Sequence, residues 1–99
     1  MAYRIEWSPR AVDDVAAIAL YIARDSLAYA KSVGKKIVRS TDKLKQFPFA
    51  ARVAPEFDNP NLREHFVYRY RVIYRIQDDT VLIVAVIHGS QLLEMELQP

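Results

Sequence analysis

Residues 70–76 read YRVIYRI and residues 80–89 read TVLIVAVIHG. In the first segment apolar or aromatic residues occupy every second position, which is the pattern of a strand with one buried face. The second segment is almost wholly apolar until it reaches His88-Gly89. Together they predict a β-hairpin, with a two-residue turn at Asp78-Asp79 between the strands.

This turn fixes the pairing of the two strands and assigns each residue to a face. It pairs Arg75 with Leu82, Ile73 with Val84 and Arg71 with Val86. The predicted core face consists of Val72, Tyr74, Ile76, Val81, Ile83, Ala85 and Ile87. The open face carries Arg71 and Arg75 beside an apolar strip of Ile73, Leu82, Val84 and Val86. His88 joins this open face, opposite Arg69 and diagonal to Arg71.

A small protein does not leave such an apolar strip bare without a reason. Either a partner covers it, or the C-terminal tail folds back over it; the apolar residues of that tail are Leu92, Leu93, Met95 and Leu97. We expect Arg71 to be exposed on this face, so that its loss changes stability by about 0–1 kcal/mol. A guanidinium there can bind a carboxylate or a phosphate with two hydrogen bonds.

The remaining sequence predicts one further strand before the helices and one after them. Residues 2–7 alternate as a strand, and Ser8-Pro9 then marks a helix start. Apolar stripes predict helices from Pro9 to Arg24 and from Leu27 to Gln46, the second ended by Pro48. After an irregular loop, residues 62–68 form the next strand. The predicted order is β-α-α-β-β-β in one α+β domain (residues 1–99), with the helical hairpin on one face of a small twisted antiparallel sheet.

The register of residues 62–68 has two interpretations, because the turn near Tyr68-Arg69 can have two lengths. One places Arg63 and His65 on the core face, and a one-residue slip exchanges them with Leu62, Glu64 and Phe66. We favour the bulged version, which places Phe66 in the core and Arg63 on the open face.

The composition excludes several classes of protein. The 99 residues contain no cysteine, so disulfides and thiolate metal sites are excluded, which fits a reducing compartment such as the cytoplasm. Arg4, Glu6 and Arg10 interrupt any apolar run that a signal peptide would need. No window approaches the ~20 apolar residues of a membrane span. No cluster has metal-ligand spacing, and a net charge of +2 argues against a generic polycation.

The chain resembles the RelE/ParE family of bacterial toxin–antitoxin toxins over nearly its whole length. The resemblance rests on the hairpin segment Tyr70 to Ile76 together with a last strand that ends in Val86-Ile87-His88-Gly89. Further shared features are Trp7-Ser8-Pro9 with Ala11 and Asp14, Phe47-Pro48, and Arg63-Glu64. The resemblance implies a small twisted sheet carrying a helical hairpin, and a cognate antitoxin as partner.

The two branches of this family differ in target. RelE-like toxins cleave mRNA in the ribosomal A site, whereas ParE-like toxins inhibit DNA gyrase. Arg71 matches the strand arginine of RelE-like toxins, and His88 could act as acid or base. However, the RelE-like arginine and tyrosine after the last strand are replaced here by Ser90-Gln91 and Leu92-Leu93, and no lysine-rich segment precedes the hairpin. The chain is therefore closer to the ParE-like branch, although members of that branch often carry arginines after the glycine.

The resemblance implies the toxin component of a type II toxin–antitoxin system, with DNA gyrase as target and no cofactor, metal or membrane. The alternatives are a ribosome-dependent mRNA endoribonuclease and a non-toxic module that binds only antitoxin. The catalytic candidates are Arg71 and His88. The candidate residues for binding target or antitoxin are Arg63, Arg69, Arg71, Ile73, Arg75, Leu82, Val84 and Val86.

Overall fold

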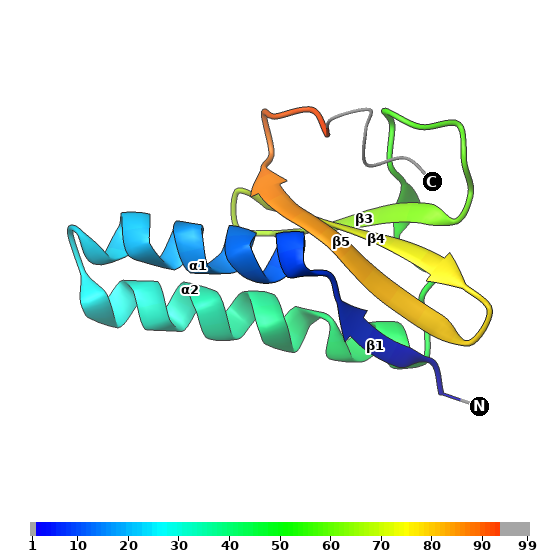
Figure 1. Cartoon of the computed structure of the whole chain (residues 1–99), viewed down its shortest axis with the longest axis horizontal. Coiled ribbons are helices and arrows are strands. Elements are labelled where there is room, and N and C mark those ends of the chain that lie inside the picture. The colour runs from blue at the N-terminus through cyan, green and yellow to red at the C-terminus, as the bar shows by residue number, and fades with distance from the viewer. Residues whose placement is uncertain (1, 94–99) are drawn as a thin grey trace.

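The computed structural model describes residues 2–93, and the predicted α+β class is confirmed (Figure 1). The strands and helices follow one another as β1 (Arg4–Trp7), α1 (Pro9–Ala23), α2 (Leu27–Ser40), a short 3-10 helix η1 (Asp42–Lys45), β2 (Arg52–Val53), β3 (Leu62–Val67), β4 (Tyr70–Gln77) and β5 (Thr80–His88). The two helices form a hairpin that packs on the sheet through α1 and β5. The second helix ends earlier than predicted, because η1 takes over its last turn.

Both helix starts are capped as the sequence predicts. The Ser8 hydroxyl accepts a hydrogen bond from the backbone N–H of Ala11 at 3.0 Å. The Ser26 hydroxyl accepts one from the N–H of Tyr29 at 3.1 Å. Each serine satisfies an amide that the first helical turn leaves without a partner, so the two positions begin helices for a local reason.

The sheet is mixed, and the predicted antiparallel pairing holds for every pair of neighbouring strands except β1 and β5. Its strand order is β1-β5-β4-β3-β2, and β1 runs parallel to β5 while the other neighbours are antiparallel. Alternation identifies a strand, but it says nothing of the neighbour that a distant strand will join. The two-residue strand β2 was not predicted, because two residues are too few to show alternation.

A β-bulge in β5 changes the predicted faces of the hairpin. Arg75 pairs with Leu82 as predicted, but Ile73 pairs with Ala85 and leaves Val84 as the extra residue. Ala85 and Ile87 therefore leave the helix-side face, and Val86 joins it, in contrast to the prediction.

The start of α1 holds this bulge in place. The Ser8 hydroxyl donates to the carbonyl oxygen of Val84 at 3.0 Å, and the Asp14 carboxylate accepts from the N–H of Val86 at 2.9 Å. β1 ends at Trp7, so these two side chains satisfy the β5 backbone beyond the end of the parallel pairing.

The turn between β3 and β4 has two residues, so the bulged interpretation of this turn is wrong. Val67 pairs with Tyr70, which places Arg63 and His65 on the helix side and leaves Phe66 half-exposed on the outer face. The turn residue Tyr68 has a φ of 54°, a conformation that few residues other than glycine adopt.

The sheet has an apolar cluster on each face. The helix-side cluster contains Ala11, Val33, Ile37, Leu44, Val67, Val72, Tyr74, Ile76, Val81, Ile83 and Val86. The outer cluster contains Ala54, Phe57, Leu62, Ile73, Val84, Ala85, Ile87 and Leu93. The sequence left open whether a partner or the C-terminal tail covers the outer face. In the structure the chain covers this face itself, with Phe57 from the loop after β2 and Leu93 from the segment after β5. The other expected tail residues, Met95 and Leu97, lie outside the described residues.

Candidate functional site

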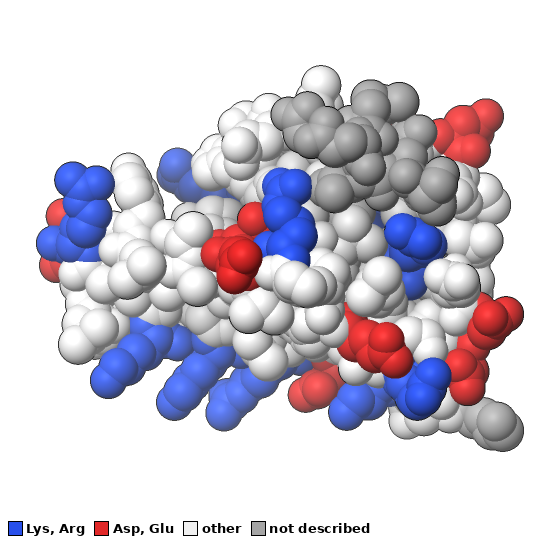
Figure 2. All heavy atoms as spheres, viewed as in Figure 1, with Lys and Arg blue, Asp and Glu red and all other residues white. Residues whose placement is uncertain are grey.

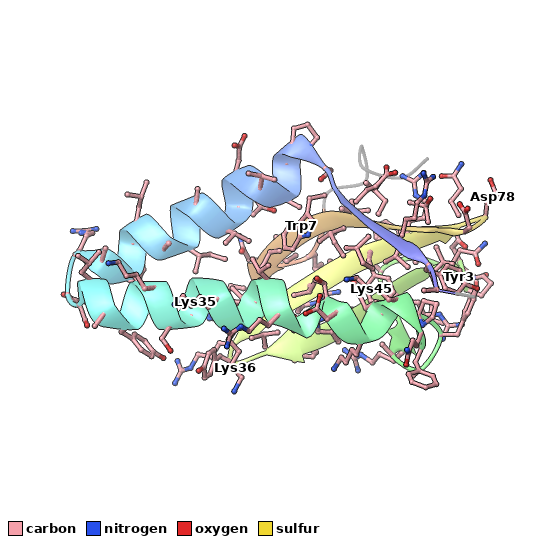
Figure 3. The ribbon with its side chains drawn as sticks, turned by 90° about the horizontal axis from the view of Figure 1, so that it is seen from below. Tyr3, Trp7, Lys35, Lys36, Lys45 and Asp78 are labelled. Carbon is pink, nitrogen blue, oxygen red and sulfur yellow. The ribbon has the colours of Figure 1, made fainter. Side chains whose placement is uncertain are left out.

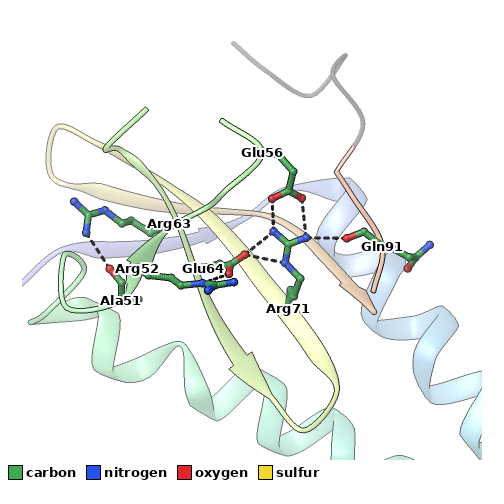
Figure 4. A network of polar contacts seen from close by, with 7 residues as sticks. All are labelled: Ala51, Arg52, Glu56, Arg63, Glu64, Arg71 and Gln91. Carbon is green, nitrogen blue, oxygen red and sulfur yellow. Dashed lines mark hydrogen bonds and ion pairs between the residues drawn. The ribbon is translucent and has the colours of Figure 1, made fainter. Parts of the chain in front are cut away.

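Arg71 is the centre of a buried polar cluster on the outer face of β4 (Figure 4). Its Nε donates to Glu64 at 2.8 Å, and Nη1 donates to Glu56 and to the carbonyl oxygen of Gln91, both at 2.7 Å. Its Nη2 donates to both carboxylates at 2.5 Å. A guanidinium has five N–H donors, so each of them has an acceptor here.

The charges of this cluster balance within the chain. Glu64 is buried and accepts from Arg52 as well as from Arg71, while Glu56 lies on the other side of the Arg71 guanidinium. The hydrogen bond from Arg71 lowers the pKa of Glu56 to about 2. The same bond raises the pKa of Arg71 above its ordinary value. The network therefore joins two arginines to two glutamates, and the lowered pKa keeps Glu56 ionised at neutral pH.

The cluster fastens two chain segments over the outer face of the sheet. The Glu56 carboxylate accepts from the backbone N–H of Leu93 at 2.9 Å, and Arg71 donates to the Gln91 carbonyl. Glu56 belongs to the loop after β2, and Gln91 and Leu93 follow β5. Arg71 therefore fixes the two segments that cover the outer face of the sheet. A phosphate could bind Arg71 only if it displaced Glu56, and it would then lie next to the carboxylate of Glu64.

The expectation that Arg71 is exposed is therefore wrong, since 3% of the residue is accessible. Two arginines on one face of a strand, Arg71 and Arg75, are compatible with a solvated face, and the sequence does not show which carboxylates will contact them. The partners Glu56 and Glu64 were not recognised in the sequence. Glu56 is separated from Arg71 by 15 positions and lies in an irregular loop, so no periodic pattern links the two.

His88 lies on the opposite face of the sheet from Arg71. It pairs with Tyr70 across the strands, and the two rings meet edge to face with their centroids 6.1 Å apart. Its Nδ1 lies 2.8 Å from the hydroxyl of Ser90. The predicted diagonal contact between His88 and Arg71 is wrong, because the extra residue Val84 inverts the alternation of β5. The structure does not bring the two catalytic candidates together.

Arg63 also lies apart from Arg71, on the helix side. It donates to the carbonyl oxygens of Phe49, Ala51 and Pro60, at 3.2, 2.9 and 2.6 Å. These bonds hold the loop on either side of β2, so the observed contacts of Arg63 are with its own chain.

The other candidates for partner binding divide into buried and accessible residues. Ile73, Val84 and Val86 are buried, and the expectation that they are exposed is wrong. Arg69 is exposed in the turn before β4. Arg75 and Leu82 are paired neighbours and partly accessible on the outer face. Their role in binding stays a prediction.

A buried histidine lies on the helix side of β3, against the end of α2. The favoured register of residues 62–68 placed His65 on the open face, but it is buried on the helix side, and its Nε2 lies 2.9 Å from the Ser40 hydroxyl. Burial, with a smaller contribution from the charge of Lys43, lowers the pKa of His65 to about 4. The imidazole is therefore neutral at neutral pH.

Residues 2–93 hold no group of three or more His, Cys, Asp or Glu side chains that could bind a metal ion. Within the same range, no helix is both long and apolar enough to cross a membrane.

Comparisons with known proteins give a family and a set of related folds. A family described as the ParE toxin of type II toxin–antitoxin systems, parDE, matches residues 5–93. The fold is similar to a structure of the chromosomal ParDE toxin–antitoxin system from P. aeruginosa, with a TM-score of 0.73 and 18% identity over 88% of this chain and 96% of that one. None of the curated proteins matched significantly.

Two further solved structures share the fold. A mutant of the E. coli toxin RelE in the free state has a TM-score of 0.67 and 17% identity, over 91% of this chain and 86% of that one. The RelBE2 toxin–antitoxin complex from Mycobacterium tuberculosis has a TM-score of 0.61 and 19% identity, over 89% of this chain and 99% of that one.

Proposed function

Since the chain belongs to the ParE toxin family of type II toxin–antitoxin systems, we propose that it inhibits growth by binding a macromolecular target and that a cognate antitoxin neutralises it. The resemblance to the ParE-like branch favours DNA gyrase as the target. Gyrase acts on DNA in the bacterial cytoplasm, which is where we place the protein.

One observation favours this proposal over ribonuclease activity: the guanidinium of Arg71 is already hydrogen-bonded to acceptors within the chain. A ribonuclease needs a group that stabilises the phosphate and another that transfers a proton. All five donors of Arg71 are engaged by the chain itself, and His88 lies on the opposite sheet face. A toxin that acts by binding does not require these two residues to meet.

The antitoxin part of the proposal is supported by the relatives. The similar structures include a ParDE system, a RelBE2 complex and a YoeB–YefM complex from Staphylococcus aureus, each described as toxin–antitoxin. Their identity to this chain is below 20%, so they support the class of partner but not the surface used.

Two assays on the purified chain test the target. In a supercoiling assay with DNA gyrase, we expect inhibition that increases with toxin concentration and disappears when the antitoxin is added. In primer extension on mRNA incubated with ribosomes, we expect no new cleavage products. A matched variant, His88→Gln, should leave supercoiling inhibition unchanged, because a binding toxin does not use this imidazole for proton transfer.

Cleavage of mRNA that is lost in His88→Gln would replace the proposal by the ribonuclease alternative. If neither assay shows activity and expression without antitoxin does not reduce colony counts, the chain is a non-toxic module that binds antitoxin.

A further inference from the structure

Positive charge is concentrated in one part of this nearly neutral chain. Residues 26–51 contain six Lys or Arg and one Asp, a net charge of +5, whereas the other 73 residues contain eight and eleven, a net charge of −3. In Figure 2 the Lys and Arg side chains project in a row along the edge where α2 lies. The cations are therefore close together in the folded protein as well as in the sequence.

Four of these cations are spaced by four residues along α2 and its continuation. Lys31, Lys35 and Arg39 lie on α2, and Lys43 follows in η1. At 1.5 Å per residue this places a cation about every 6 Å, over roughly 18 Å. All four side chains are exposed, and none forms an ion pair within residues 2–93. We call these four residues the cationic row.

The cationic row works against the stability of its own helix. Like charges four residues apart repel one another on a helix surface, and α2 contains no acidic residue that would offset them. The one acidic residue of the segment, Asp42, pairs with Lys45 instead. An arrangement that is unfavourable in the free protein suggests a bound anion.

A groove runs beside the cationic row, between α2 and the turn before β4. It is lined by Ser32, Lys35, Lys36, Arg39, Ser40 and Tyr68, with a volume of about 590 Å³. The wall residue Tyr68 has a φ of 54°, where glycine or asparagine is usual, and Lys36 lies 5.1 Å from its ring centroid. Figure 3 shows Lys35 and Lys36 on α2. The groove thus presents ammonium, guanidinium and hydroxyl donors and no carboxylate.

We propose that the cationic row binds the phosphate backbone of a nucleic acid. One strand of duplex DNA carries a phosphate about every 3.4 Å along the axis, so roughly 18 Å of cations faces about five phosphates. An acidic protein segment fits less well, because the buried centre of a protein interface is more apolar than its rim, and Tyr68 is the one large apolar side chain among the groove residues. This inference goes beyond the proposed function and does not depend on it.

Fluorescence anisotropy with labelled DNA of about 20 nucleotides, single-stranded and duplex, tests the proposal at salt concentrations from about 50 to 200 mM. Four phosphate contacts predict a slope of log K against log salt of about −3.6 for duplex and about −2.8 for a single strand. For duplex, the affinity should fall about a hundredfold over this range. A double variant, Lys35→Ala with Arg39→Ala, should reduce the size of the duplex slope by about 1.8.

The control removes the same charge elsewhere. Arg4→Ala with Arg24→Ala takes two exposed cations from β1 and from the end of α1, and it should leave the slope unchanged. Circular dichroism verifies that both double variants fold. Equal slopes in the two double variants, or no binding at the lowest salt, would overturn the proposal. Competition by polyglutamate as strong as by unlabelled DNA would also overturn it, and would identify an acidic protein as the occupant. The assay contains no gyrase, so its failure would leave the proposed function standing.

Discussion

Replacement of Arg71 by alanine should destabilise the protein severely. The Arg71 side chain is 4% accessible, and those of Glu56 and Glu64 are 7% and 0% accessible. Removal of Arg71 therefore leaves two buried carboxylates without their main cation. Breaking a buried ion pair by removing one partner costs about 3–5 kcal/mol, because the other charge stays buried. Domains of this kind have a total stability of about 5–15 kcal/mol, so the loss is a large fraction of it.

The shifted pKa of Glu56 gives an independent value for the same interaction. Arg71 lowers this pKa from the ordinary 4.5 to about 2. At about 1.4 kcal/mol per pKa unit, ionised Glu56 contributes about 3 kcal/mol above pH 4.5. A lowered carboxyl pKa means that the unfolded chain binds more protons between pH 4.5 and 2, so this stability is lost as the pH falls through that range.

Urea unfolding at several pH values is the assay. At pH 7 we expect Arg71→Ala to lower the unfolding free energy by about 3–5 kcal/mol, and the melting temperature by roughly 12–40 °C. The difference from wild type should shrink below pH 4.5. Arg75→Ala, on the same strand and face but with no ion pair within residues 2–93, is the matched control and should change stability by less than about 1 kcal/mol.

A loss below about 1 kcal/mol in Arg71→Ala would refute the reasoning, as would a difference that stays constant with pH. If Arg71→Ala does not fold, Arg71→Leu combined with Glu56→Gln and Glu64→Gln should restore folding, because no buried charge is then left without a partner.

Three further comparisons test other contacts of the fold. Because the pKa of His65 is lowered to about 4, the unfolded chain binds more protons than the folded protein below pH 6.5. The unfolding free energy should therefore fall by up to about 3 kcal/mol between pH 6.5 and 4. In urea unfolding at several pH values, His65→Leu should flatten this part of the pH dependence. Gly89→Ala should cost about 1–3 kcal/mol, because its Cβ would lie 3.1 Å from a backbone carbonyl oxygen, whereas Gly34→Ala, with nothing within 4 Å, should gain up to about 1 kcal/mol; equal melting temperatures would contradict this contrast. Tyr74→Phe removes a hydrogen bond of 2.7 Å to the carbonyl oxygen of Pro48 and should lower the unfolding free energy by about 1–3 kcal/mol, while an unchanged value would mean that the loop carbonyl finds another donor.

The sequence alone determined the local features of this protein. The helix starts at Ser8 and Ser26 are capped by hydroxyls within three residues, so neighbouring positions contain the whole signal. The same is true of the β4–β5 hairpin near its turn, where the pairing of Arg75 with Leu82 follows from the turn length. The α+β class followed because hydrophobic periodicity depends on residues a few positions apart.

Features that depend on distant segments were decided by the tertiary structure. The bulge at Val84 is held by Ser8 and Asp14, whose bonding partners in β5 lie 76 and 72 positions further along the chain. This bulge moves His88 away from the face of Arg71. The sequence pattern of β5 does not indicate that Ser8 and Asp14 will bond to this strand. The identity of the cover on the outer face depended in the same way on where the loop after β2 and the segment after β5 come to lie.

The contrast is clearest at Arg71, whose residue type and strand were evident while its role was not. An arginine that alternates with apolar residues along a strand is equally consistent with a solvated face, a phosphate site or a buried ion pair. The choice is made by Glu56, which reaches the guanidinium from an irregular loop with no periodic pattern. Local propensity specifies secondary structure because its interactions are short in sequence, whereas burial and charge pairing depend on contacts that exist only after the segments have packed.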